Sequence, residues 1–494
     1  MSDRDFDLIV LGGGPAGVTA ALRAAELGAR VALVERDRMG GTCTDDGCAP
    51  TRVLAQAARL LRDADQYSAY GLMGERPELD FPRLLARTQE AIYRIHEKKQ
   101  LAAHLSRAGV EVHENAGTTA FVDPFTVELA SGVQLTADRF VICVGGHARR
   151  LPIPGAELAL THSDVWRMER LPASVAIVGA SATGVQLASV FDTFGSWVLL
   201  LEVAPRVLAG EDELVSWALT DAFERRGIGL KVGVGGIDRI ESDDAAFRIA
   251  YRDGGERRDA SVEAVILAVG WTGNLDDLDL EAAGVATERG FITVDESLRT
   301  SADHIFAAGD VTGRMMLVQS ATFEARVAAE NAIRGGGLRS SHALVPHGGF
   351  TDPEYASVGL PEHLAGDPSR HVVAAVPYAE LDRSVIDGRT EGLAKLIVDR
   401  SGQILGAHVV GEQAVEIVQI VAVGMAAGMT VGQLAEMEFA YPTYTSILGL
   451  AARQVVHQLQ RDEAADPWHA LGRRPLAEWE RRDLTTVMTD TAGS

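Results

Sequence analysis

Residues 7–35 read DLIVLGGGPAGVTAALRAAELGARVALVE, and this stretch decides the fold of the chain. An apolar run over residues 7–11 predicts a strand, the alanine-rich segment to about Leu27 predicts a helix, and residues 30–34 predict a second strand. A glycine-rich turn separates the first strand from the helix. Together these parts form the βαβ unit that typically holds a dinucleotide.

The glycines of this turn have separate tasks. We expect Gly12 to make the tight turn, Gly14 to let the backbone approach a pyrophosphate, and Gly17 to let helix and strand pack closely. The second strand ends in Glu35, which can accept hydrogen bonds from a ribose. A lone glycine motif is weak evidence, but here the strand, the helix and the acid all stand at the expected distances.

A second unit of the same kind lies farther along the chain. Residues 175–178 predict a strand, GASATG at residues 179–184 is the turn, and residues 198–201 predict the next strand, which ends in Glu202. Ser181 replaces the middle glycine. Because the pattern occurs twice in one chain, we expect two bound dinucleotides.

Glu202 bears on the choice of nicotinamide cofactor. An acid at the end of the second strand suits a free ribose hydroxyl and repels a 2′-phosphate, so NADH is expected over NADPH. Arg206 stands close enough in the sequence to act as a phosphate partner instead, and it could equally be an ordinary surface charge.

Two of the three cysteines stand in the segment after the first unit, GGTCTDDGCAPTR at residues 40–52. A spacing of five positions, about one and a half helical turns, brings Cys43 and Cys48 onto neighbouring faces. Gly47 and Pro50 allow the local departure from a helix that lets the sulfurs meet. A reversible disulfide beside a cofactor is therefore feasible. The alternative, two buried cysteines that serve as small apolar residues, leaves the flanking glycines unexplained.

Composition narrows the classes of protein to consider. A chain of 494 residues suggests about three domains, and 47% hydrophobic residues supply ample cores. A net charge of −23 argues against a nucleic acid or an anionic membrane as partner. The first apolar stretch is interrupted by glycines and preceded by acids, so we expect neither a secretory nor a membrane segment. Three cysteines fit a reducing compartment, and we predict a cytoplasmic protein in which Cys143 is inert.

With both units and the cysteine pair, the chain resembles the flavoprotein disulfide reductases over about residues 5–455. Further matches are CVGG at residues 143–146, AVG at residues 268–270 and IFAAGD at residues 305–310. The resemblance implies FAD in the first unit, NAD in the second, an inner Cys48 that faces the flavin and an outer Cys43 that meets substrate. It also implies an α/β fold with two Rossmann-like dinucleotide-binding domains and an α+β C-terminal domain that makes a homodimer.

The resemblance and the motifs together set the expected boundaries and site. The FAD-binding domain is expected at residues 1–152 and 280–337, the NAD-binding domain at 153–279, the dimerisation domain at 343–458 and a C-terminal tail at 459–494. The expected cofactor-binding residues are Gly12, Gly14, Gly17, Glu35, Gly41, Thr42, Arg52, Gly145, Asp310, Gly179, Ser181, Gly184, Gln186, Glu202 and Gly270. By resemblance Asp310 bonds the FAD ribityl chain or pyrophosphate; the alternative is a turn aspartate.

The chain departs from the family at the residues that handle protons. Thiol-linked members carry a histidine and, five residues later, a glutamate, whereas this chain has Tyr441 and Ser446. Mercuric reductases also carry tyrosine there, but this chain lacks their C-terminal vicinal cysteines. The predicted catalytic residues are therefore Cys43, Cys48 and Tyr441, and dihydrolipoamide and glutathione disulfide are expected to be poor substrates.

Two further departures concern charge near the sulfurs. The family's lysine after the second cysteine is Arg52 here, and the glutamate that pairs with it is Gln186. Arg52 is expected to favour a thiolate on Cys48 or an anionic reduced flavin. Asp45 and Asp46 are expected either to disfavour a thiolate on the outer cysteine and draw in a cation, or to be solvated loop acids.

These observations predict a homodimeric FAD enzyme. Hydride from NADH passes through flavin to the Cys43–Cys48 disulfide, and two electrons then pass to a small disulfide or related acceptor. One alternative acceptor is a soft metal ion such as Hg²⁺, as in mercuric reductases. A further alternative, from another class, is a flavin-loaded redox sensor with low turnover.

Overall fold

The computed structural model describes residues 4–244 and 246–463. The contacts divide the chain into two units, which are described separately. Unit 1 runs from the first described residues to Gly179 and includes Val190–Val198 and Gly235–His342. Unit 2 holds Ala180–Ser189, Leu199–Val234 and the chain from Ala343 onward. The predicted C-terminal tail falls largely outside the described residues.

The first βαβ unit forms as predicted. β1 (Phe6–Leu11), α1 (Pro15–Glu26) and β2 (Val31–Val34) follow one another, and β1 pairs in parallel with β2 and with β6 (Gln134–Ile142). The sheet has the strand order β3-β2-β1-β6-β5-β4, with β19 (Ile305–Ala307) beside β6. Parallel strands end at one edge of a sheet, so their glycine turns gather there.

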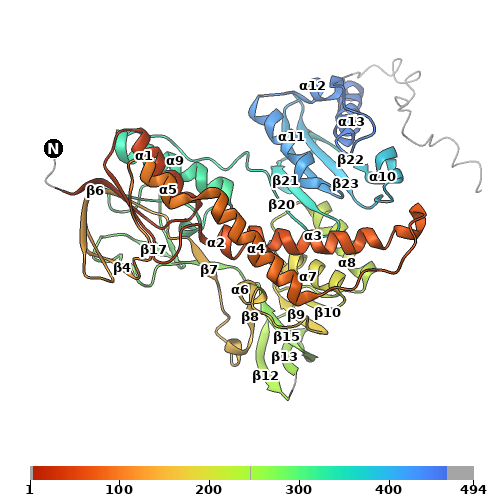
Figure 1. Ribbon diagram of the computed structural model, residues 1–494. Helices are drawn as coiled ribbons and strands as arrows, with labels where there is room; N and C mark the ends of the chain where they lie inside the picture. Colours follow the sequence, from red (N-terminus) through yellow and green to blue (C-terminus); the bar gives the residue numbers. More distant parts are fainter. Residues whose placement is uncertain (1–3, 245, 464–494) are drawn as a thin grey trace, which may run out of the picture. The chain divides into compact units, whose positions relative to one another are not determined.

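Each face of this sheet has its own core, because side chains alternate along a strand. Leu8 and Val10 pack with α1 and α9 (Val318–Arg334) on one face, where the two helices lie side by side (Figure 1). Ile9 and Leu11 pack on the opposite face. Strands buried on both faces read as continuous apolar runs, and this explains the sequence of β1.

Unit 1 also contains two long neighbouring helices, α3 (Cys48–Ala64) and α4 (Phe81–Lys99) (Figure 1). The other helices and strands of unit 1 are α2 (Gly41–Asp45), α5 (Leu101–Arg107), β3 (Glu111–His113), β4 (Thr119–Asp123), β5 (Thr126–Leu129), β7 (Gly146–Ala148), β8 (Leu160–Thr161), α6 (His162–Val165), β9 (Ser174–Val178), β12 (Ile237–Asp243), β13 (Ala246–Asp253), β14 (Glu256–Val262), β15 (Ala264–Leu267), β16 (Trp271–Gly273), β17 (Thr287–Glu288) and β18 (Phe291–Ile292).

The predicted second βαβ segment continues from β9 into α7 (Ala182–Phe194) and β10 (Trp197–Leu201). In unit 1, β15 pairs in parallel with β8 and β9. In unit 2, β10 pairs in parallel with β11 (Gly229–Lys231), and α8 (Glu213–Arg226) precedes that strand. Both predicted dinucleotide segments therefore have the parallel pairing that the sequence pattern requires.

Unit 2 also contains an antiparallel sheet with the strand order β20-β21-β24-β23-β22. Its core packs against three helices, α11 (Ala414–Ala426), α12 (Val431–Glu436) and α13 (Ser446–Glu463), so the apolar face of α11 serves at least in part as core packing. The bounds are β20 (His347–Gly349), β21 (Tyr355–Gly359), β22 (His371–Pro377), α10 (Asp382–Ile386), β23 (Leu393–Asp399), β24 (Ile404–Val410), α11 (Ala414–Ala426), α12 (Val431–Glu436) and α13 (Ser446–Glu463).

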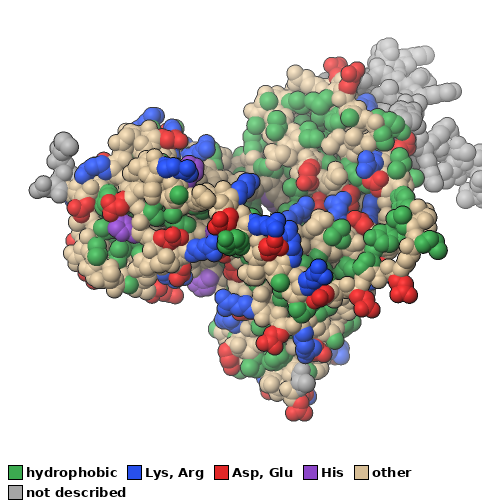
Figure 2. All heavy atoms as spheres, viewed as in Figure 1, with side chains coloured by type: hydrophobic (Ala, Val, Ile, Leu, Met, Phe, Trp, Pro, Cys, Tyr) green, Lys and Arg blue, Asp and Glu red, His purple; other side chains and the backbone are tan. Residues whose placement is uncertain are grey.

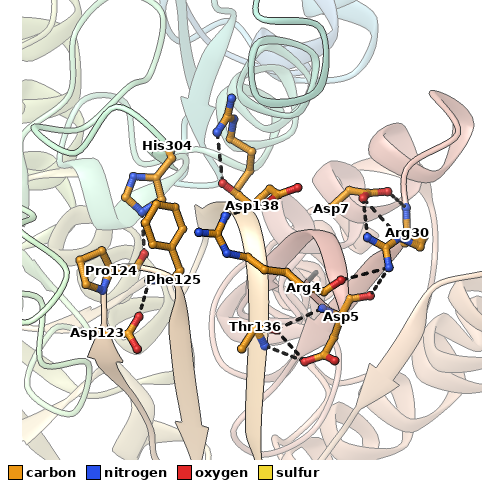
Figure 3. Close-up of polar contacts among 11 residues, drawn as sticks. Arg4, Asp5, Asp7, Arg30, Asp123, Pro124, Phe125, Thr136, Asp138 and His304 are labelled. Carbon is orange, nitrogen blue, oxygen red and sulfur yellow. Dashed lines mark hydrogen bonds and ion pairs between the residues drawn. The ribbon is translucent and has the colours of Figure 1, made fainter. Parts of the chain in front are cut away.

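The first strand is tied to its neighbours by polar contacts at the start of β1 (Figure 3). Arg4 pairs with Asp138 of β6 at 2.6 Å and lies over the ring of Phe125 at 3.7 Å. Asp7 accepts from Arg30, just before β2, at 2.8 Å. These charges are partly exposed, and exposed pairs contribute little to stability, so the apolar core determines the strand order.

The surface carries mixed charge. On the face drawn in Figure 2, the described basic and acidic side chains are interspersed among hydrophobic and neutral ones. Within the part of the chain that the structure describes, none of the helices combines the length and the hydropathy that a membrane span needs.

Candidate functional site

The glycines of the first turn are required by close packing. Gly12 has φ +103°, and a Cβ there would collide with the carbonyl group of Cys143. A Cβ on Gly17 would collide with the carbonyl group of Gly12. Gly14 differs, because the nearest atom to its hypothetical Cβ is Gly41 Cα at 3.8 Å. The turn is therefore closely packed at Gly12 and Gly17 but has space beside Gly14, where a pyrophosphate needs room.

The two predicted ribose acids occupy matching environments. Glu35 accepts from the backbone N–H of Gly13 at 2.5 Å and of Asp37 at 2.9 Å. Glu202 accepts from the N–H of Ala180 at 2.5 Å and of Ala204 at 2.7 Å. Each carboxylate is therefore held in place by its own glycine-rich turn before any ribose binds.

Four segments of unit 1 meet at the first turn. The backbone near Gly41 approaches Gly14, and a Cβ on Gly309 would lie 3.3 Å from Ala16 Cβ. A Cβ on Gly146, just after the predicted Gly145, would lie 3.8 Å from Asp310 Cβ. These segments, distant in sequence, form one glycine-lined cradle that carries Asp310. Such a cradle fits an extended dinucleotide such as FAD, with the cysteine segment beginning at its edge.

The cysteines lie where α2 gives way to α3. The helix is interrupted at Asp46 and Gly47, and Cys48 begins α3. The thiols of Cys43 and Cys48 form a hydrogen bond, as the expected meeting of the sulfurs requires. This bond and the backbone at the start of α3 lower the pKa of Cys48 to about 7 against the effect of burial. Hydrogen bonding to Cys48, together with burial, raises the pKa of Cys43.

Cys143 differs from the pair in its surroundings. It is buried in the core beneath the first turn, and this burial raises the pKa of its thiol. A buried neutral thiol reacts poorly, which agrees with the expectation that Cys143 is inert.

Asp45 and Asp46 are not solvated loop acids, so that expectation is wrong. Asp45 Oδ1 lies 2.5 Å from His96 Nε2 of α4. Asp46 accepts from Ser163 Oγ at 2.5 Å and from Trp166 Nε1 at 3.0 Å, and its Oδ2 lies 3.4 Å from His162 Nε2.

The partners of Asp46 determine how it titrates. Burial would raise the pKa of this carboxyl, but the hydrogen bonds from His162, Ser163 and Trp166 outweigh burial and hold the pKa below its ordinary value. Asp46 therefore stays ionised in the folded protein at neutral pH, within a bonded cluster rather than in solvent.

A buried carboxylate missed by the sequence reading supports the turn at Asp310. Glu324 of α9 is fully buried, accepts from the N–H of Gly309 at 2.8 Å, and lies 2.8 Å from His342 Nε2. Burial and then the charge of Glu324 raise the pKa of Asp310 to about 6. One signal was available, because Glu324 lies between the alanines of α9 at positions 321, 325 and 328, which share its buried face.

Tyr441 lies in unit 2 and is about half exposed. Its hydroxyl donates to Asp382 of α10 at 2.6 Å. The hydroxyl of Ser446 donates to the Thr443 carbonyl at 2.7 Å. The missing family glutamate is therefore not replaced by Ser446, whereas Asp382 provides a carboxylate at the tyrosine.

Other predicted residues have mostly local partners. Gln186 accepts from the N–H of Phe350 at 3.1 Å and donates to the Ala182 carbonyl at 2.8 Å. Arg52 lies on α3 and is exposed. Gly179 has φ +101°, and a Cβ there would collide with the Ala268 carbonyl group. The remaining predicted positions are placed as follows: Thr42 in α2, Ser181 just before α7, Gly184 in α7, and Gly270 between β15 and β16 with φ +102°.

Arg206 is engaged within its own loop. The guanidinium group donates to the carbonyls of Leu208 at 3.3 Å, Ala209 at 2.8 Å and Glu211 at 2.9 Å. Three backbone acceptors hold the side chain, so a phosphate would have to compete with them.

Two dinucleotide turns, a dithiol pair at the edge of the first and a separate antiparallel sheet define the class of flavin-dependent pyridine nucleotide oxidoreductases. The family model described as pyridine nucleotide-disulphide oxidoreductase matches residues 6–325, and that of its dimerisation domain matches residues 345–452. The chain belongs to this family.

Individual relatives of the chain are enzymes of the same family. The chain is 33% identical over 462 residues to a dihydrolipoyl dehydrogenase of Zymomonas mobilis, covering 90% of this chain and 96% of that one. It is 32% identical over 452 residues to a mercuric reductase of Bacillus cereus, covering 90% and 71%. The copper(II) complex of the HOCl-induced flavoprotein disulfide reductase RclA from Escherichia coli is similar in structure, with a TM-score of 0.80, 27% identity and coverage of 91% and 99%.

The fold prediction and the cofactor prediction are thereby confirmed at the level of the family. The protein is an FAD-dependent oxidoreductase that uses a pyridine nucleotide and a redox-active disulfide. It carries the family's dimerisation domain.

Proposed function

We propose that the enzyme takes hydride from NADH and reduces a low-molecular-weight disulfide through the Cys43–Cys48 pair. The observation that carries this proposal is the placement of the two thiols next to each other where α2 gives way to α3, an arrangement that lowers the pKa of Cys48. A thiol that ionises near neutral pH beside a second thiol is suited to disulfide exchange. Bound FAD supplies the transfer of two electrons from the nicotinamide to the cysteine pair.

The exchange step balances without another reagent. Cys43 passes its proton to the neighbouring Cys48 thiolate as it attacks one sulfur of the acceptor, a mixed disulfide forms, and the first thiolate of the acceptor leaves and takes up that proton. The Cys48 thiolate then attacks Cys43, which releases the second thiolate and closes the Cys43–Cys48 disulfide. The acceptor gains two electrons, and NADH restores the dithiol.

NADH oxidation measured against a panel of disulfides tests this proposal. We expect acceptor-dependent turnover that Cys43→Ser and Cys48→Ser abolish and that Cys143→Ser preserves. Turnover that survives Cys43→Ser would overturn the assignment. FAD reduction by NADH with no turnover of any acceptor would favour the redox sensor.

We also propose that NADH is preferred over NADPH. Two backbone donors hold the Glu202 carboxylate in place, and this carboxylate would repel a 2′-phosphate. The guanidinium group of Arg206 is already bonded to three carbonyls, so it would have to leave them to bind that phosphate. The ratio of kcat/KM for the two nucleotides measures the preference. A ratio near one, or in favour of NADPH, would contradict this reasoning and point to release of Arg206 from its carbonyls.

Reduction of a soft metal ion is the second candidate function. It is supported by two thiols in contact, by the similarity to a mercuric reductase, and by a relative whose structure is a copper(II) complex. Among the described residues no group of three or more His, Cys, Asp or Glu is arranged to hold a metal ion. Oxidation of NADH that depends on Hg²⁺ or Cu²⁺, but on no disulfide, would favour this candidate.

We further propose that the protein works as a homodimer in the cytoplasm. The dimerisation domain supports the dimer, and the scarcity of cysteines supports a reducing compartment. Sedimentation velocity of the purified holoenzyme tests the dimer.

A further inference from the structure

The segment between the two cysteines is held from one side by α4. Lys99 Nζ donates to Thr44 Oγ1 at 3.1 Å, and Thr44 is the residue directly after Cys43. One turn earlier on the same helix, His96 contacts Asp45 at 2.5 Å. The end of α4 therefore brings a cation next to the outer cysteine.

The segment is held from the other side by α6 and the residue that follows it. Ser163 and Trp166 donate to the Asp46 carboxylate, and Trp166 Nε1 also donates to the Asp46 carbonyl at 2.9 Å. His162, at 3.4 Å from the same carboxylate, contacts the ring of Trp271 with a centroid distance of 4.8 Å.

These contacts give hydrogen-bond partners to the two carboxylates that follow Cys43. Each carboxylate of the segment has a histidine partner, and Asp46 has two more hydrogen-bond donors. Lys99 is exposed at the end of α4, and its Nζ donates to the neutral hydroxyl of Thr44. The charge of Lys99 opposes the rise in the pKa of Cys43, whereas the nearby charges of Cys48 and Asp310 add to that rise.

We propose that Lys99 makes the outer thiol Cys43 selective for disulfides that carry negative charge close to the sulfur–sulfur bond. This inference rests on the proposed function and names the class of its acceptor. In that role Lys99 is a specificity-determining residue: it attracts the acceptor and stabilises the thiolate that leaves, without itself reacting. It also reverses the expectation from the sequence, in which Asp45 and Asp46 draw a cation to the site.

Two alkylating reagents of similar size but different charge measure the electrostatic field at Cys43. In a Cys48→Ser background we would compare iodoacetate, which is anionic, with iodoacetamide, which is neutral. Both consume the same thiolate, so the ratio of their rates cancels the pKa of Cys43 and leaves the effect of reagent charge. Adding Lys99→Met should lower the ratio about three- to tenfold, the range for one nearby charge in a partly screened site.

Two controls separate charge from structure. Lys99→Arg retains the charge and should restore most of the ratio, whereas Lys98→Met removes a neighbouring exposed charge and should leave the ratio unchanged. A ratio that is the same with and without Lys99 would overturn the proposal, as would an equal effect of Lys98→Met.

Turnover then tests the acceptor class in the holoenzyme with intact cysteines. We expect kcat/KM to fall in the order dithiodipropionate, hydroxyethyl disulfide, cystamine, and the spread to narrow in Lys99→Met. Equal rates for the three disulfides would overturn the selectivity. If none is reduced while the alkylation ratio still depends on Lys99, then the proposed acceptor is wrong and the field at Cys43 is right.

Discussion

Replacing Cys43 with alanine should make Cys48 harder to ionise. The Cys43 thiol is the strongest influence that lowers the pKa of Cys48 from an ordinary 9.0 to about 7. The whole fall from 9.0 to about 7, which also includes the opposing effects of burial and of the backbone, corresponds to a change of about 100-fold in the ionisation equilibrium. Because the Cys48 residue still reaches solvent, which screens part of the effect, we expect about tenfold, or about 1.4 kcal/mol, from Cys43.

The assay is the pH dependence of iodoacetamide alkylation at Cys48 in the reduced holoenzyme. The midpoint should lie near 7 in the parent and move upward in Cys43→Ala. Cys43→Ser keeps a hydroxyl donor and should show a smaller rise. If Cys43→Ala leaves the midpoint unchanged, the start of α3 and the bound cofactor set the ionisation, and the hydrogen bond between the thiols does not.

Three further outcomes are expected. Reduction by NADH should give a long-wavelength thiolate-to-flavin absorbance band, and Cys48→Ser should abolish it while FAD stays bound; a band that persists would show that the other sulfur faces the flavin. Lys395→Met should lower the free energy of unfolding in urea by about 3–5 kcal/mol, because it leaves the buried Asp212 carboxylate without its cationic partner, and adding Asp212→Asn should recover part of the loss. Dihydrolipoamide should turn over about 10²- to 10⁴-fold more slowly than in thiol-linked relatives, because Tyr441 and Ser446 do not supply the usual acid and base; turnover on the order of 10² s⁻¹ would refute this.

The sequence predicted the parts of the site that depend on local geometry. A glycine that must approach a carbonyl, or a strand that ends in an acid, leaves a pattern within about 30 residues. Both βαβ segments were predicted for this reason, and their strand bounds differ from the structure by one residue or so. The spacing of Cys43 and Cys48 likewise contained enough information to predict their contact.

The contacts that surround the two cysteines cannot be recognised from a local sequence pattern, because they join residues far apart in the chain. Asp45 meets His96, which lies 51 positions later, and Asp46 meets Ser163, which lies 117 positions later. A single histidine on a helix looks the same in the sequence whether it faces solvent or a carboxylate. The charge at a site therefore depends on tertiary pairing, which the formal charges of the segment do not reveal.

Three glutamates perform one structural task at three turns of this protein. Glu35 accepts from the N–H of Gly13, Glu202 from that of Ala180, and Glu324 from that of Gly309. A helix or turn that begins with uncovered N–H groups needs acceptors, and an ionised carboxylate is the strongest acceptor available among side chains. Glutamine at the first two positions would turn an NH₂ group toward one of the two backbone donors that each carboxylate now accepts. The acid at the end of each strand is therefore specified by the backbone of its turn as well as by a ribose, so its presence indicates a dinucleotide turn more firmly than it indicates which nucleotide binds.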